Sequence, residues 1–301
     1  MTFEQYLHRM MTPSLASLRK YLPGVYRNRG TEPLHRTRVA LRRLRNVLKV
    51  FENFFPNKKV RRWNTALRAL GQATGAARDL DVQMIFLRDY LRPLRNPQER
   101  RAVGQLIVAL KEQRAKLQPA LVRSVKQFER SGILNEMLAV TRTFLVGKNS
   151  RPFDALADVG REKIKKRLKT LLSFEKHVYH PRRVEELHRM RIAAKHLRYT
   201  LEGFFRYYGN GMTPHIQAVL LVHRTLGTLH DDDVWLMRLA DFRRFAPDDK
   251  DFQRMLARME IFCRRHRGRV YRRLVKAWGL YRRRKSWEGL NQFVMSYPGK
   301  D

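Results

Sequence analysis

Apolar residues recur at intervals of three and four along nearly the whole chain, and strand-type alternation is scarce. This spacing places apolar side chains along one face of an α-helix. Proline and glycine punctuate the pattern at intervals. The pattern predicts an all-α protein with helices near residues 3–21, 34–55, 57–73, 79–91, 98–129, 133–146, 153–175, 183–208, 213–228, 231–244, 248–279 and 286–295.

The order of features repeats on the two sides of one turn-rich segment. Residues 147–152 are rich in turn-forming residues and form the best candidate for a linker. Before and after it come a first helix, a helix led by histidine, another helix, an Asp-rich junction and a long basic helix. The sequence therefore predicts an N-terminal helical half, 1–150, and a C-terminal helical half, 151–301.

The Asp-rich junctions, 75–82 and 227–234, share the pattern G-x-x-[R/H]-D-x-D-V. We expect each junction to separate two helices, with Asp79 and Asp231 as N-caps. Asp81 and Asp233 are expected to orient arginines of a binding site through ion pairs. The shared pattern and its fixed order argue for an internal duplication.

A row of basic residues marks each histidine-led helix. Within each row the residues step by three and four, so they lie on one stripe of a helix. Neighbouring cations at this spacing repel each other by about 0.2–0.5 kcal/mol per pair, which favours a function in binding a polyanion. The first basic row consists of His35, Arg38, Arg42, Arg45 and Lys49, and the second of His188, Arg191, Lys195 and Arg198.

Each row lies beside an apolar seam rather than opposite to it. In the first half the seam includes Leu41, Leu44 and Leu48, and the row is one residue ahead, a rotation of about 100°. Residues 34–49 include no Asp or Glu, so a face neutralised by neighbouring acids is disfavoured. We expect the two rows to face each other across a groove between the halves. The first row would extend for about 21 Å, which suits a linear polyanion.

Overall charge and composition support an anionic ligand. The chain has 64 Lys and Arg against 27 Asp and Glu, a formal net charge of +37. A hydrophobic content of 43% still allows a packed core. Cys263 is the single cysteine, so an intrachain disulfide is excluded and a reducing compartment is favoured. With no run of 18 apolar residues and no signal peptide pattern at the N-terminus, we expect a cytoplasmic protein without a membrane span.

The two H-x-x-R-x-x-x-[R/K]-x-x-R helices and the two G-x-x-[R/H]-D-x-D-V junctions resemble the CHAD domain, the conserved histidine α-helical domain. The resemblance covers nearly the whole chain, including its duplication. It implies two four-helix bundles related by a pseudo-two-fold axis, a basic central channel that binds inorganic polyphosphate, and association with polyphosphate granules. By position, it assigns anion binding to both rows except Lys49, which rests on its spacing, and Tyr199 also fits the family pattern.

Other basic residues are candidates for the same site. Arg161, Lys165 and Lys169 form a stripe on the helix that opens the second half, and Arg265 and Arg272 lie on the long last basic helix. Some members of the family carry a triphosphate-tunnel domain beside this one. Because no β-rich segment with alternating Glu and Lys occurs here, we expect the binding domain alone.

The sequence offers little for catalysis, metal or cofactor binding. The run from His230 to Asp233 could suggest a metal site, but adjacent residues of a helix point in different directions. Common nucleotide and hydrolase motifs are absent, and phosphoryl transfer normally needs metal ligands as well as cations. We therefore expect a non-enzymatic protein without a cofactor. Nucleic-acid binding is the alternative, and it would be at least nonspecific at low salt; the oligomeric state stays open.

Overall fold

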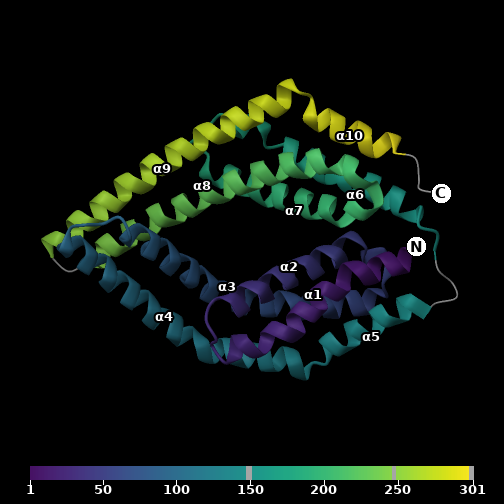
Figure 1. Ribbon diagram of the computed structural model, residues 1–301, viewed down its shortest axis with the longest axis horizontal. Helices are drawn as coiled ribbons and strands as arrows, with labels where there is room; N and C mark the ends of the chain where they lie inside the picture. The colour runs from purple at the N-terminus through teal and green to yellow at the C-terminus, as the bar shows by residue number, and fades with distance from the viewer. Residues whose placement is uncertain (147–150, 246–248, 298–301) are drawn as a thin grey trace. The chain divides into compact units, whose positions relative to one another are not determined.

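The computed structural model describes residues 1–146, 151–245 and 249–297 (Figure 1). These ranges are helical apart from short connections and include no strand, so the predicted all-α class is confirmed. Contacts between Cα atoms divide the chain into two compact units, Met1–Ala155 and Leu156–Asp301, which we call unit 1 and unit 2. Of the predicted linker 147–152, residues 147–150 lie outside the described residues.

In unit 1, α2 packs against α1 and α3, α3 lies beside α4, and α1 also contacts α4 and α5 (Figure 1). Aromatic side chains fill the end of the core where Phe3 meets Phe51 and Phe54. A capping box formed by Thr2 and Gln5 starts the first helix. The helices are α1 (Phe3–Tyr26), α2 (Glu32–Val50), α3 (Asn57–Leu91), α4 (Pro97–Arg130) and α5 (Ile133–Val146), with a 3-10 turn at Glu52–Phe54.

In unit 2, α8 lies between α7 and α9 and contacts both along their length (Figure 1). The short α10 packs on α8 and α9, where Trp287 contacts Trp278. The side chain of Asp249 caps the start of α9. The helices are α6 (Ala155–Leu172), α7 (Val184–Tyr208), α8 (Thr213–Phe245), α9 (Lys250–Arg283) and α10 (Ser286–Ser296), with 3-10 turns at Glu175–His177 and Gly209–Met212.

The prediction that the Asp-rich junctions separate helices is wrong. Both junctions, 75–82 and 227–234, lie inside single long helices, α3 and α8. Asp79 and Asp231 are therefore not N-caps. A glycine inside a helix costs only about 1 kcal/mol relative to alanine. Burial of the residues around each junction, such as Leu80 and Leu229, favours a continuous helix by more than that.

Candidate anion-binding site

The first basic row lies on α2, which also carries a buried apolar seam beside the row. Leu41, Leu44 and Leu48 are at most 2% exposed, and this burial fixes the rotation of the helix within unit 1. The three residues of the row toward the C-terminal end, Arg42, Arg45 and Lys49, are exposed. His35 and Arg38, nearer the start of the helix, are half-buried. The row thus passes from a sheltered end to an open end.

Arg38 is held against α3. Its Nη1 donates a hydrogen bond to the carbonyl oxygen of Gly71 at 3.0 Å. A Cβ atom at Gly75 would lie 3.3 Å from the same nitrogen, so glycine keeps space for the guanidinium. Burial is the main cause that lowers the pKa of Arg38, and Asp79 opposes it. Because an arginine keeps its charge even so, Arg38 is a cation in a fixed position.

Arg78 of α3 adds a further charge at the sheltered end of the first row. Burial lowers the pKa of His35, and the positive charge of Arg78 lowers it further. A bound anion would reverse this effect on His35. Sequence reasoning did not nominate Arg78, although it occupies the [R/H] position of the duplicated junction pattern. The position was missed because the junction was expected to be a break between helices.

The second basic row lies on α7 and is more sheltered than the first. Its four members are all half-buried. Nδ1 of His188 lies 3.0 Å from Nδ1 of His230, and the centroids of the two rings are 4.2 Å apart. His230 belongs to α8 and occupies the same motif position as Arg78. It is the second residue that sequence reasoning missed.

Arg198 ends the second row with contacts to three neighbours. Its Nη1 lies 3.4 Å from Nδ1 of His223, and its Nε lies 3.1 Å from a carboxylate oxygen of Glu202. The guanidinium carbon is 4.5 Å from the centroid of the Tyr199 ring. Tyr199 is only 6% exposed, so its ring packs within unit 2 and supports Arg198 through a cation–π contact.

The aspartates of the junctions form ion pairs, but not with arginines of the rows. Asp81 pairs with Arg114 of α4, where the guanidinium Nε lies 3.3 Å from the carboxylate. Asp233 pairs in the same way with Arg267 of α9. The expected ion pairs are therefore present, but their arginines are not among the candidate site residues, so a role in orienting the binding site stays a prediction. Each pair fastens the junction helix to the long helix that follows.

The outlying candidates have varied surroundings. Arg161 donates to a carboxylate oxygen of Asp158 at 3.2 Å and to the backbone oxygen of Tyr297 at 3.3 Å, so it also holds part of unit 2 together. The other outlying candidates, Lys165, Lys169, Arg265 and Arg272, are exposed. Their part in anion binding stays a prediction, as does the groove expected between the halves.

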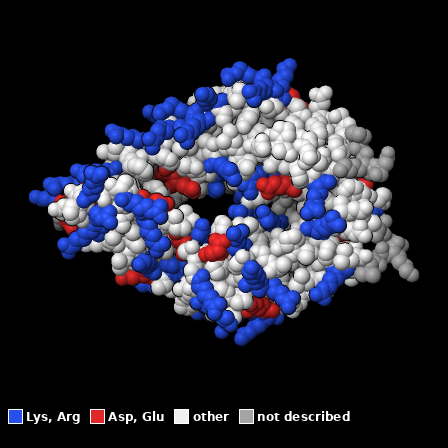
Figure 2. Space-filling view, in the orientation of Figure 1, with Lys and Arg blue, Asp and Glu red and all other residues white. Residues whose placement is uncertain are grey.

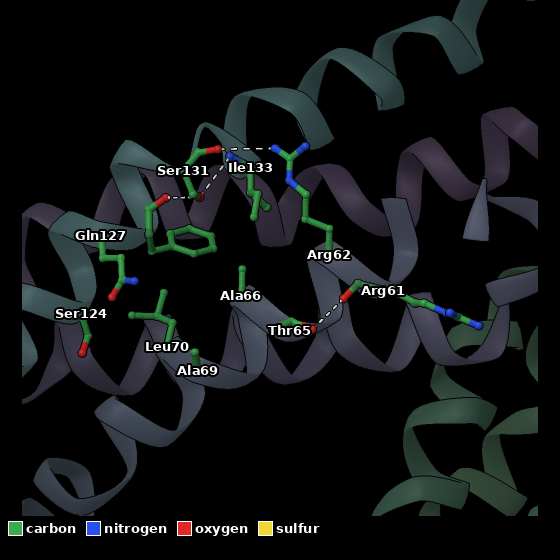
Figure 3. A pocket seen from close by; sticks show the side chains of 11 residues that line it. Arg61, Arg62, Thr65, Ala66, Ala69, Leu70, Ser124, Gln127, Ser131 and Ile133 are labelled. Atoms are coloured by element: carbon green, nitrogen blue, oxygen red, sulfur yellow. Dashed lines mark hydrogen bonds between the residues drawn. The ribbon is translucent and has the colours of Figure 1, made fainter. Parts of the chain in front are cut away.

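A cavity of another kind opens in unit 1. It has a volume of about 540 Å³ and lies between α3, α4 and the start of α5 (Figure 3). Ala66, Leu70 and Phe128 contribute to a largely apolar lining. Figure 3 shows Arg62 reaching toward Ser131; Arg62 also pairs with Glu136 at 3.1 Å. This cavity therefore differs from the basic rows, because its lining is largely apolar and one of its two arginines, Arg62, is paired with an acid.

The wider surface is strongly basic. Figure 2 shows Lys and Arg side chains over much of the visible surface, with fewer Asp and Glu among them. Within the described ranges, His, Cys, Asp and Glu side chains form no group of three or more that could hold a metal ion. In the same part of the chain no helix is long and apolar enough to cross a membrane.

Comparisons with known proteins give one family and one fold. The sequence profile of the CHAD domain matches residues 9–240. The crystal structure of the CHAD domain from the plant Ricinus communis superposes with a TM-score of 0.62 at 20% sequence identity, covering 100% of this chain and 94% of that one. At this identity the likeness shows the fold alone. No curated protein matches the sequence.

Proposed function

Because the chain belongs to the CHAD domain family, which is associated with polyphosphate binding, we propose that it binds inorganic polyphosphate through its two basic rows and does not cleave it. The observation that carries the proposal is the exposed end of the first row, where Arg42, Arg45 and Lys49 lie on one stripe of α2. On the solvent side of α2 and α7, Arg36 pairs with Glu32 and Arg189 with Glu185. Among the described residues, no carboxylate lies within ion-pair distance of the row residue Arg45.

Acids therefore neutralise the outer residues Arg36 and Arg189, whereas Arg45 of the first row has no such partner among the described residues and Arg198 of the second row shares Glu202. The guanidinium groups of a row can donate paired hydrogen bonds to phosphate oxygens. Lys49 and Lys195 add point charges. Neutralising a linear polyanion releases its counterions, so the affinity falls steeply as salt rises. Phosphoryl transfer normally needs metal ligands as well as cations, so rows made mainly of cations support binding rather than cleavage.

The experiment compares two variants with the same loss of charge. Arg42→Gln with Lys195→Gln removes one cation from each row, and the control Arg43→Gln with Arg189→Gln removes one exposed cation from each of the same helices. A hydrogen bond to a charged group contributes about 1.5–3 kcal/mol, so we expect the row variant to weaken polyphosphate binding by about 10²–10⁴-fold. The control should change affinity by only a few-fold, in proportion to its lost charge.

The salt dependence gives a second reading of the same variants. For a single-stranded polyanion, each phosphate contact contributes about 0.7 to the slope of log affinity against log salt. The row variant should lose about two such contacts and the control none. Equal losses of affinity and slope in both variants would show that bulk charge, and not the rows, binds the polymer.

Nucleic-acid binding is the second candidate, and the net charge of +37 favours it. A single-strand site usually interleaves aromatic side chains with its cations. The one aromatic residue adjoining a row, Tyr199, is buried and packs against Arg198. Polyphosphate should therefore displace bound RNA or DNA at physiological salt, while the reverse displacement should be poor. Release of phosphate from polyphosphate with Mg²⁺, lost in the row variant, would instead make the protein an enzyme.

The same proposal gives an expected location in the cell. A binding protein for this polymer should concentrate at cytoplasmic polyphosphate granules. A fluorescent fusion should lose that location when Arg42 and Lys195 are replaced and keep it when Arg43 and Arg189 are replaced.

A further inference from the structure

The apolar cavity of unit 1 borders a phenylalanine ring. Phe128 of α4 lines this cavity, and no aromatic ring of the described residues pairs with it. The cavity volume of about 540 Å³ lies within the range of about 300–1,000 Å³ that is typical of small-molecule sites. A cavity of about 150 Å³ is enough to bind benzene. The cavity therefore has room for a molecule larger than a single aromatic ring.

The internal duplication identifies the part of unit 2 that is equivalent to this region. The turn after α4 passes through Gly132 and the turn after α9 through Lys285, and both residues have a positive φ, of 68° and 49°. The separation of these two residues along the sequence equals that of Arg114 and Arg267, which form the equivalent ion pairs. The pair of helices α4 and α5 therefore corresponds, residue by residue around the turn, to α9 and α10.

The same separation relates Phe128 to Tyr281 and Leu134 to Trp287. In unit 2 the chain covers its own ring, because the ring centroids of Tyr281 and Trp287 lie 5.6 Å apart at an interplanar angle of 68°. Trp287 also contacts Trp278 and is only 1% exposed. Unit 2 thus supplies an indole beside its ring, whereas unit 1 has a leucine at that position and a cavity beside Phe128.

The polar groups of the lining are arranged mainly to accept hydrogen bonds. The hydroxyl groups of Thr65, Ser124 and Ser131 donate to backbone oxygens at 2.9, 3.0 and 2.6 Å. Because each hydroxyl proton is already used, the hydroxyl oxygens offer lone pairs. The side-chain amide of Gln127 also lines the cavity and adds a carbonyl oxygen (Figure 3). A ligand with an N–H group can therefore donate to the lining.

The charge at the cavity is already balanced. Arg62 pairs with Glu136 at 3.1 Å, and Glu136 also accepts a hydrogen bond from the indole nitrogen of Trp63 at 3.0 Å. Figure 3 shows the side chain of Arg61 extending away from Ala66. An anionic ligand would have to compete with Glu136 for Arg62, whereas a neutral ligand would leave that ion pair intact. The cavity thus favours a neutral molecule.

We propose that the cavity of unit 1 binds a neutral, planar aromatic molecule of one or two fused rings that carries an N–H donor. Its ring packs edge to face on Phe128, as Trp287 packs on Tyr281 in unit 2, and its N–H donates to an oxygen of the lining. The small side chain of Ala66 leaves space for the ring. No residue of the first basic row lines the cavity, so this site and the proposed polyphosphate site use different residues.

The experiment titrates the protein with indole and follows the methyl signals of residues that line the cavity, including Leu70 and Ile133, by NMR. Indole should shift these signals in a saturable manner. Ala66→Phe fills the cavity and should abolish binding, whereas Ala115→Phe adds the same side chain at an exposed position of α4 and should leave binding unchanged. Phe128→Leu removes the ring and should weaken binding by about two- to tenfold.

Two related probes test the chemical class of the ligand. 1-Methylindole lacks the N–H donor and should bind about two- to tenfold more weakly than indole. Indole-3-acetate carries a negative charge and, in high salt that screens long-range attraction, should bind no more tightly than indole. Saturating polyphosphate should not displace indole. Tighter binding of either related probe, or displacement by polyphosphate, would contradict the proposed ligand class or the separation of the two sites.

Other outcomes would overturn the site itself. These are the absence of a saturable shift with indole, shifts that spread beyond the cavity, and equal binding in a folded Ala66→Phe variant. Self-association that Ala66→Phe abolishes, in a protein that does not bind indole, would make the cavity an interface between copies of the chain. Should Ala66→Phe fail to fold, Ala69→Phe decides, because Ala69 is exposed at the rim of the same cavity.

Discussion

The buried ion pair between α3 and α4 allows a stability prediction with a definite sign. Asp81 is 3% exposed and Arg114 is 9% exposed, and they approach to 3.3 Å. Arg114 also donates to the side-chain oxygen of Gln118 at 2.9 Å. Gln118 in turn donates to the backbone oxygens of Val25 and Tyr26 at the end of α1. One arginine therefore joins three helices of unit 1.

We expect Arg114→Met to destabilise unit 1 by about 3–5 kcal/mol near pH 7, because it leaves the Asp81 carboxylate buried without its partner. Methionine has a similar length and adapts to irregular space, so the loss comes mainly from the uncompensated charge. Adding Asp81→Asn removes that charge. Replacement of both members of a buried pair is often close to neutral, and the double variant should recover most of the loss.

The pH dependence of the single variant tests the same reasoning. Burial already raises the pKa of Asp81 despite the nearby arginines, and loss of Arg114 raises it further. A folded-state pKa above the unfolded value means that the folded protein binds more protons as pH falls, so stability is regained in that direction. The destabilisation by Arg114→Met should therefore shrink between about pH 7 and about pH 5.

Urea unfolding followed by circular dichroism at both pH values measures these differences, and hydrogen exchange in α3 and α4 assigns them to unit 1. The double-mutant cycle isolates the interaction of Asp81 with Arg114. The reasoning would fail if Arg114→Met cost less than about 1 kcal/mol near pH 7. It would fail equally if Asp81→Asn did not rescue the variant, or if the loss were the same at both pH values.

Two further predictions concern packing. Gly160→Ala should destabilise unit 2 by about 1–3 kcal/mol, because the new Cβ would lie 2.6 Å from the hydroxyl oxygen of Tyr208 in the core. The matched change Gly104→Ala, in a helix with open space around the position, should raise stability by up to about 1 kcal/mol; thermal unfolding compares the two variants. Cys263 is fully buried, and burial raises the pKa of its thiol to about 12, so an aromatic disulfide reagent should label it only after unfolding.

Much of the fold could be predicted from the sequence because its signals are local. The three- and four-residue spacing on α2 and α7 is a property of each helix alone, and the structure buries the seams that it predicts. Asn96 and Pro97 likewise mark the start of α4 without help from distant residues. Such signals are sufficient to predict the helical class and the face of the helix on which each basic row lies.

The predictions from the sequence are wrong where packing against a residue distant in sequence determines the structure. The glycine and aspartates of each junction are typical of a helix end, yet buried neighbours keep α3 and α8 continuous. The same continuity sets which side chains face which helix. It places Arg78 near His35 and His230 against His188, and it turns Asp81 toward Arg114. These pairings depend on the register between two helices, which spacing within one helix does not encode.

The duplicated rows have also diverged in how their cations are held. Arg45 and Lys49 project from α2 into solvent. A ligand that fixes such long side chains removes their rotational freedom, which costs about 0.5–1.5 kcal/mol of binding free energy for each side chain. Arg198 is already fixed by Glu202, His223 and the ring of Tyr199, so it loses less freedom on binding, but a phosphate must share it with a carboxylate. The first row therefore offers more accessible charge, and the second offers charge that its neighbours already hold in place. The duplicated backbone thus carries two arrangements of cations, which differ in the rotational freedom that a bound polyanion would remove.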